Sequence, residues 1–105
     1  MDPVLKHHGR TCKEAKQRFD PEFSYMVFDR HVSTGEKEEF SVIYDILSSF
    51  AKGTTEMEIC RDDTKEKYSL IVKATPNDID IMVNKFLDQE LQDRFNYCVY
   101  SAFDI

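Results

Sequence analysis

Two stretches of alternating residues on either side of a polar turn constrain the fold of this chain most strongly. From Thr54 to Arg61 and again from Lys67 to Ala74, apolar and polar side chains alternate with a period of two, which is typical of half-buried strands. The turn RDDTKE between them is short and polar, so the two strands are predicted to form a hairpin. One face of the hairpin carries Met57, Ile59, Leu70 and Val72, and the other carries Glu56, Glu58, Cys60, Ser69, Ile71 and Lys73.

A helix is predicted immediately before this hairpin. Apolar side chains recur there at three- and four-residue spacing, which indicates a helix with one buried face. These side chains are Phe40, Ile43, Tyr44, Leu47, Phe50 and Ala51. Ser33 or Thr34 is expected to cap the helix. Lys52-Gly53 is expected to end it, because glycine readily adopts the left-handed conformation that follows a helix C-terminus.

A second helix is predicted immediately after the hairpin. Thr75 and Asp78 have the spacing of a capping box, and Pro76 occupies the first helical position, where the missing N–H costs nothing. Helical spacing of apolar residues then continues to Arg94. The stretch from Asn96 to Phe103 is rich in aromatic and small apolar residues, and it is predicted to be a terminal strand.

Two shorter elements are expected near the N-terminus. Thr11 to Phe19 begins with capping-box spacing to Glu14, and it ends where the residue before a proline is disfavoured in a helix. It is predicted to be a short helix with an apolar stripe of Cys12, Ala15 and Phe19. Phe23 to Val32, rich in aromatic and β-branched residues, is predicted to be a strand.

From residue 22 onward, the expected order of elements is therefore β-α-β-β-α-β. With right-handed crossovers, this order predicts an α+β fold of the ferredoxin-like type. Four antiparallel strands would lie in the order fourth, first, third, second, with both long helices on one face. Residues 1–21 would form a basic N-terminal segment with an extra short helix, and residues 22–105 a single domain.

The charge of the chain is distributed unevenly. The net charge is −6, but residues 1–18 carry +3 and residues 19–105 carry −9. An acidic body repels nucleic-acid phosphates, whereas the basic segment 1–18 could bind them or fold back onto the body. No apolar run approaches the length of about 20 residues that crosses a membrane. We therefore expect no membrane partner.

The cysteines indicate a reducing compartment. Cys12, Cys60 and Cys98 are odd in number, far apart, and without a C-x-x-C spacing. Buried or partly buried free thiols are the expected state, because free cysteine behaves as a small apolar side chain. With no leader-like apolar segment at the N-terminus, the protein is predicted to be cytoplasmic.

The predicted fold leaves one face of the sheet without a long helix. An exposed face that mixes apolar and acidic residues is typical of a contact surface. The residues predicted to bind a partner there are Phe28, Glu56, Glu58, Ile71 and Tyr100. The short N-terminal helix is an alternative cover, and its basic residues would then lie near Glu56 and Glu58. Self-pairing into a homodimer through this face is a further alternative.

Asp29, Arg30 and His31 end the first predicted strand and raise the possibility of a catalytic or metal site. No second carboxylate at useful spacing and no glycine-rich phosphate loop accompanies them. The adjacent pair His7-His8 also has no further ligand at a suitable spacing. A solvated strand end is therefore the favoured interpretation, and no catalytic residue, metal or cofactor is predicted.

Three hypotheses for function remain. The favoured one is a small acidic module that regulates or inhibits a protein partner, which it binds through the open sheet face or an edge strand. The second is RNA or nucleic-acid binding, because RNA-recognition modules share this order of elements and stack bases on aromatic side chains of the sheet. The third is a small metal-dependent nuclease or a phosphatase-type hydrolase that uses Asp29 and His31.

Overall fold

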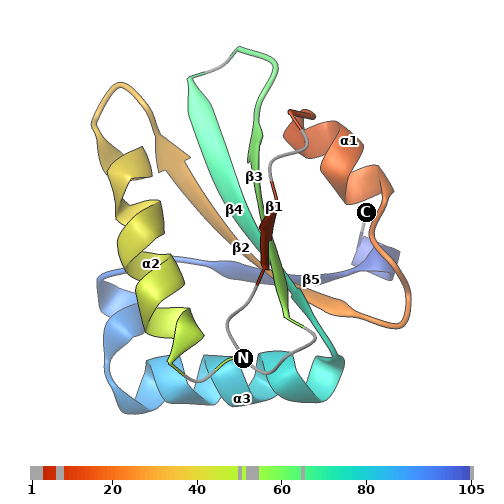
Figure 1. Cartoon of the computed structure of the whole chain (residues 1–105), viewed down its shortest axis with the longest axis vertical. Helices are drawn as coiled ribbons and strands as arrows, with labels where there is room; N and C mark the ends of the chain where they lie inside the picture. Colours follow the sequence, from red (N-terminus) through yellow and green to blue (C-terminus); the bar gives the residue numbers. More distant parts are fainter. Residues whose placement is uncertain (1–3, 7–8, 50, 52–54, 65, 105) are drawn as a thin grey trace.

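The computed structural model is a five-stranded sheet with helices on both faces, and it describes residues 4–6, 9–49, 51, 55–64 and 66–104 (Figure 1). The strands are β1 Val4–Lys6, β2 Ser24–His31, β3 Glu56–Arg61, β4 Lys67–Ala74 and β5 Cys98–Ser101. The α-helices are α1 Cys12–Gln17, α2 Glu39–Ser48 and α3 Pro76–Asp88. Three short 3-10 helices complete the chain: η1 Glu36–Glu38, η2 Leu91–Asp93 and η3 Ala102–Asp104.

The strands lie in the order β1-β3-β4-β2-β5. β2 pairs antiparallel with both β4 and β5, and β3 pairs antiparallel with β4. The predictions of a mixed α+β architecture, a hairpin and a four-stranded antiparallel sheet are confirmed. In the hairpin, the register places Met57 opposite Val72 and Glu58 opposite Ile71, so directly opposed residues share a face as the alternation required.

β1 was not predicted. Val4–Lys6 lies beside β3 in parallel, with Val4 opposite Glu56 and Lys6 opposite Glu58 (Figure 1). The basic segment 1–21 therefore contributes both a strand and a helix to the structure. His7 and His8, which the sequence singled out, lie outside the described residues.

The helix caps follow the sequence at two of three places. The hydroxyl of Thr11 accepts the Glu14 N–H at 3.2 Å while the Glu14 carboxylate accepts the Thr11 N–H at 3.1 Å, which completes the capping box of α1. Thr75 caps α3 by accepting the Asp78 N–H at 3.2 Å. The cap expected at Ser33 or Thr34 is wrong.

A turn through Gly35 replaces that cap. Gly35 has a φ of 74°, and it leads into η1 before α2 begins at Glu39. The end expected at Lys52-Gly53 includes residues outside those described, and α2 itself ends at Ser48. α3 also ends earlier than predicted: Glu90 adopts a φ of 56°, and the chain continues as η2. Leu91, which the predicted helix would have included, therefore belongs to η2 and not to α3.

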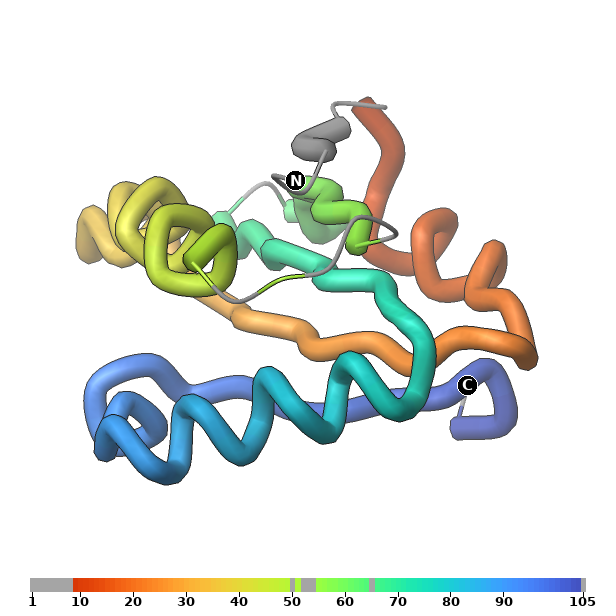
Figure 2. The backbone as a smooth tube through the Cα atoms, turned by 60° about the horizontal axis from the view of Figure 1, so that its bottom comes forward, coloured from red at the N-terminus to blue at the C-terminus, as the bar shows by residue number. Residues whose placement is uncertain are grey.

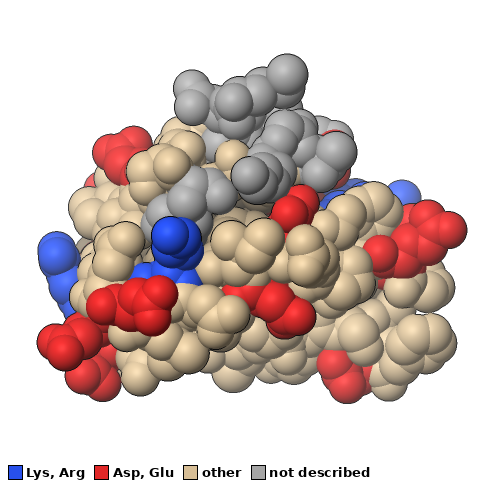
Figure 3. All heavy atoms as spheres, turned by 90° about the horizontal axis from the view of Figure 1, so that it is seen from below, with Lys and Arg blue, Asp and Glu red and all other residues tan. Residues whose placement is uncertain are grey.

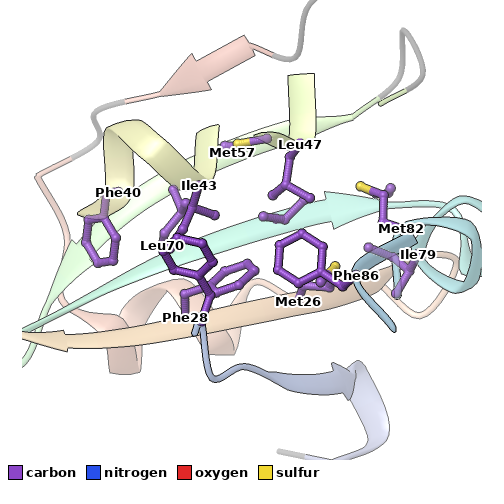
Figure 4. Packing of buried hydrophobic residues seen from close by; sticks show 13 residues of the cluster. Met26, Phe28, Phe40, Ile43, Leu47, Met57, Leu70, Ile79, Met82 and Phe86 are labelled. Atoms are coloured by element: carbon purple, nitrogen blue, oxygen red, sulfur yellow. The ribbon is translucent and has the colours of Figure 1, made fainter. Parts of the chain in front are cut away.

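α2 and α3 cover one face of the sheet and enclose the main core (Figures 2 and 4). Phe28 lies at its centre, with its ring 5.8 Å from that of Phe86 and 5.6 Å from that of Tyr97, measured between centroids. The other buried members are Met26, Phe40, Ile43, Leu47, Met57, Leu70, Val72, Ala74, Ile79, Met82 and Phe95. Burial of this many large apolar side chains is the principal stabilising contribution to the fold.

Candidate functional site

The face of the sheet opposite the long helices is covered in part by α1. Ala15 of this helix packs with Tyr25, Val27, Cys60 and Ile71 in a second, smaller apolar cluster. The ring of Phe19 stacks on that of Tyr25, with 3.7 Å between centroids. The expectation of an open face is therefore wrong for its apolar part, and the alternative of a cover by the N-terminal helix is confirmed.

A disulfide joins this cover to the sheet. Cys12, the first residue of α1, is bonded to Cys60 of β3, with 5.0 Å between their Cα atoms. That separation is within the ordinary range for disulfides. The prediction of three free thiols is therefore wrong for two of the cysteines, and Cys98 is the free one. Sequence spacing could not reveal the pair, because only the fold brings residues 48 positions apart together.

Two of the five predicted partner-binding residues are buried. Phe28 is 0% exposed and lies in the main core on the opposite face. Ile71 is 3% exposed and lies beneath α1. The assignment of Phe28 to the open face was wrong. Because β2 is apolar on both faces, the alternation of its side chains cannot show which set points to which face. Neither side chain is available to a partner in this structure.

The acidic pair on β3 is engaged with the N-terminal segment. Arg10 donates from Nε to Glu58 Oε2 at 2.5 Å and from Nη2 to Glu58 Oε1 at 2.6 Å. The hydrogen bond to Glu58 raises the pKa of Arg10, although burial opposes the shift. Glu56 is half-buried and stands opposite Lys73 of β4. The expected proximity of N-terminal bases to these glutamates is thus present at Glu58.

A recess of about 300 Å³ lies between α1 and these strands. Its charged lining residues are Arg10, Arg18, Lys73, Glu56 and Glu58. Phe19, Tyr25 and Ile71 provide apolar surface. Because bases and acids line it together, the recess has no single charge preference and points to no one class of ligand.

Tyr100, the last predicted partner-binding residue, lies on β5 and packs against the second cluster. Lys16 of α1 places its Nζ 5.2 Å from the centre of the Tyr100 ring. The pKa of Tyr100 is raised, first by the charge of Cys98 and by a hydrogen bond with it, and further by Asp29 and Asp104. Tyr100 is therefore a half-buried residue in an acidic environment.

The strand-end trio does not converge on one site. Asp29 accepts a hydrogen bond from Ser69 and lies 3.5 Å from Lys67 Nζ on the α1 face. Arg30 points to the other face, where it is buried and donates to Glu39 and to two backbone carbonyls. Among the described residues, no group of three His, Cys, Asp or Glu side chains could hold a metal ion. Strand alternation thus separates Asp29 from Arg30.

Two of the three aromatic residues on which an RNA-binding surface would depend are also enclosed. Tyr25 is buried beneath α1, and Phe28 is buried in the main core. Tyr68 packs against the main core and carries Lys37 Nζ 4.0 Å above its ring centre. Bases could not stack on Tyr25 or Phe28 without rearrangement of the structure.

An edge strand is one of the binding surfaces that the sequence predicts, and one edge of the sheet is formed by β5. β5 stands last in the sheet order, so its outer backbone groups have no strand partner among the described residues. Val99 is 48% exposed, Cys98 is exposed, and Phe103 just after the strand is 82% exposed. The last strand stands at an edge in the predicted sheet order, but the sequence pattern does not show that Val99 on this strand is exposed.

In the part of the chain that the structure describes, no helix has the length and apolar character needed to span a membrane. Comparison with protein-family models, with curated proteins and with solved structures found no match to this chain.

Proposed function

We propose that this protein is an interaction module that binds an extended segment of a partner protein along the outer edge of β5. The observation that carries the proposal is an edge strand whose neighbouring side chains, Val99 and Phe103, are apolar and exposed. An extended peptide that adds to such an edge gains backbone hydrogen bonds, and alternate side chains contact the apolar residues. The function is thus binding, and no catalytic step is proposed.

The charge of the chain favours a basic partner segment. The net charge is −6, and acidic side chains are prominent on the face seen from the α3 side (Figure 3). The pKa of Tyr100 on β5 is raised mainly by Cys98 and by burial, and the acidic side chains of Asp29 and Asp104 add smaller contributions. Complementary charge speeds association and selects among partners.

The other surfaces of the sheet are less suited to binding an extended partner segment. The sheet face opposite the long helices is occupied by α1, and the far edge of the sheet carries the three-residue strand β1. A short edge strand provides few backbone groups for an added strand, which is one way in which proteins limit edge pairing. β5 has four residues, and the exposed apolar side chains of Val99 and Phe103 lie on it or just after it, so it is the preferred edge.

We infer that the four antiparallel strands and two long helices are a ferredoxin-like plait to which β1 and α1 have been added. A small module of this kind would act as a regulator or inhibitor by occupying a segment of its partner. A cytoplasmic location stays a prediction, and the Cys12–Cys60 disulfide counts against it because such bonds persist mainly in oxidising compartments.

Selection of displayed peptides on the immobilised protein tests the proposal. We expect enrichment of segments with alternating apolar residues and several Lys or Arg. Val99→Lys should abolish their binding, because a lysine on the edge opposes strand addition. Val42→Lys is the matched control, since Val42 is an exposed valine on α2 and the added charge is the same. Binding should survive that change.

Amide hydrogen exchange locates the contact. Protection of the backbone in residues 98–101 should increase when a selected peptide binds. Peptides that bind both variants equally, or that leave these amides unchanged, would overturn the proposal. Light scattering of the protein alone separates a second outcome: a concentration-dependent dimer lost in Val99→Lys would mean that a second copy occupies the edge instead.

A further inference from the structure

A second recess lies at the opposite edge of the sheet from β5, where β3 passes beyond the end of β1. It measures about 380 Å³, and its lining includes Gly9, Arg10, Lys37, Ile59, Arg61 and Tyr68, together with the disulfide-bonded Cys60. We call it the basic recess. Three of these residues are cationic and none is a carboxylate, which is unusual in a chain with a net charge of −6.

Two of the three cations have no ion-pair partner within the described residues. Arg61 donates from Nη1 to the carbonyl of Gly9 at 2.8 Å, a contact that fixes the guanidinium. The nearest carboxylate effect is weak: the pKa of Glu14 is lowered chiefly by hydrogen bonds from Thr11 and only in small part by the charge of Arg61. Lys37 stands 4.0 Å above the ring centre of Tyr68, although its neighbours in η1 are Glu36 and Glu38. Arg10, the third, is engaged by Glu58. Arg61 and Lys37 therefore provide the available positive charge.

The positions of these groups are fixed by the fold. Gly9 has a φ of 67°, which turns its carbonyl into reach of Arg61. Thr11 forms a bridge with Arg61 directly beyond this turn. A cation held in place before a ligand arrives loses little side-chain entropy on binding, so such a site recognises anions efficiently.

We propose that the basic recess binds a phosphate monoester with a small apolar body. A planar guanidinium and an ammonium group together suit a dianionic phosphate, to which both can donate charge-assisted hydrogen bonds. Ile59 and Tyr68 offer apolar surface for the rest of the ligand. The volume lies in the range of small-molecule sites and exceeds what a single inorganic phosphate fills. This site is independent of the proposed partner edge at β5.

Titration of the full chain with phenyl phosphate, followed by NMR, tests this inference. The largest amide shifts should fall on residues 9–10, 37, 59–61 and 68. Arg61→Gln and Lys37→Gln should each weaken binding about tenfold, which is the usual effect of losing one charge-assisted hydrogen bond. Lys85→Gln, an exposed lysine on α3, changes the net charge equally and should leave the affinity unchanged.

Two further ligands define the chemical class. Benzoate, a monoanion with the same ring, should bind much more weakly, and benzyl alcohol should not bind. The inference is overturned if phenyl phosphate causes no shifts at millimolar concentration, if benzoate binds equally well, or if the shifts gather around Arg18 and Lys73 in the other recess. Because Lys37→Gln leaves the contact between Arg61 and Gly9 intact, it tests the site even where Arg61→Gln disturbs folding.

Discussion

Arg30 of β2 and Glu39 of α2 form an ion pair in which Arg30 Nε donates to Glu39 Oε2 at 3.0 Å. The guanidinium is buried, whereas the carboxylate is partly exposed. Arg30 Nη1 donates to the carbonyls of Asp29 and Asn96 at 2.7 and 3.2 Å, and Nη2 has no partner within the described residues. Glu39 is therefore the group that compensates an enclosed positive charge where β2 ends and α2 begins.

Replacing Glu39 by alanine should lower the free energy of unfolding by about 1–2 kcal/mol, because it leaves the buried Arg30 without its counter-charge. Urea denaturation measures the loss. Glu38→Ala is the control: Glu38 is exposed, lies at the same helix end, and should cost less than about 0.5 kcal/mol. Equal losses would mean that the charge at the helix N-terminus matters, and not the contact with Arg30.

Phe28→Ala should lower the free energy of unfolding by about 3–5 kcal/mol, because removal of this large side chain would leave a cavity at the centre of the main core. Phe103→Ala should cost almost nothing, because this ring is exposed. Thermal and urea denaturation of the two variants provide the comparison. A small loss of stability in Phe28→Ala would contradict the burial of this β2 side chain against α3.

Reduction of the Cys12–Cys60 disulfide should destabilise the protein by about 2–4 kcal/mol, because the bond limits the freedom of the unfolded chain. Melting curves with and without dithiothreitol measure this effect. Cys12→Ser should reproduce the loss and abolish the response to the reductant. Cys98→Ser, which removes the free thiol, should leave both unchanged. An identical melting temperature in both redox states would contradict the bond.

Stability should fall in alkaline solution as Tyr25 ionises. Burial raises the pKa of Tyr25 above the usual value of about 10, although the Asp20 N–H, which it accepts at 2.6 Å, opposes the shift. Since the pKa is higher in the folded than in the unfolded state, the contribution is complete below the unfolded value. It is lost as the pH rises through the folded value.

Urea denaturation at several values above about pH 9 tests this dependence. Tyr25→Phe should be less stable at neutral pH, because the Asp20 N–H loses its acceptor, but its stability should decline less steeply in alkali. The same alkaline slope in both proteins would show that Tyr25 does not contribute to it.

Local patterns predicted the parts of this fold that local physics determines. The capping box at Thr11 and the N-cap at Thr75 form because each needs only residues within one turn. The hairpin follows from alternation on strands that have one polar face. β1 escaped prediction because three residues hold too little pattern, and its place depends on β3, which is far away in the sequence.

The candidate site was harder to predict for the same reason. In β2, residues 25–28 are all buried, because α1 covers one face and the long helices cover the other. No polar residue marks which side is which, so Phe28 was placed on the wrong face. Exposure of β5 depends on its position at the end of the sheet, and the pairing of Cys12 with Cys60 depends on how α1 lies over β3.

The bond between α1 and β3 also determines how the molecule responds to force. When tension is applied between the two termini, the residues between Cys12 and Cys60 cannot extend, since the load passes through the sulfur atoms. That loop has a contour of roughly 160 Å at the usual length per residue. The first long helix and the interior strand β2 lie inside it. Mechanical unravelling of the oxidised chain must therefore stop short of its full extension, and a reductant would release the remainder as a separate increment.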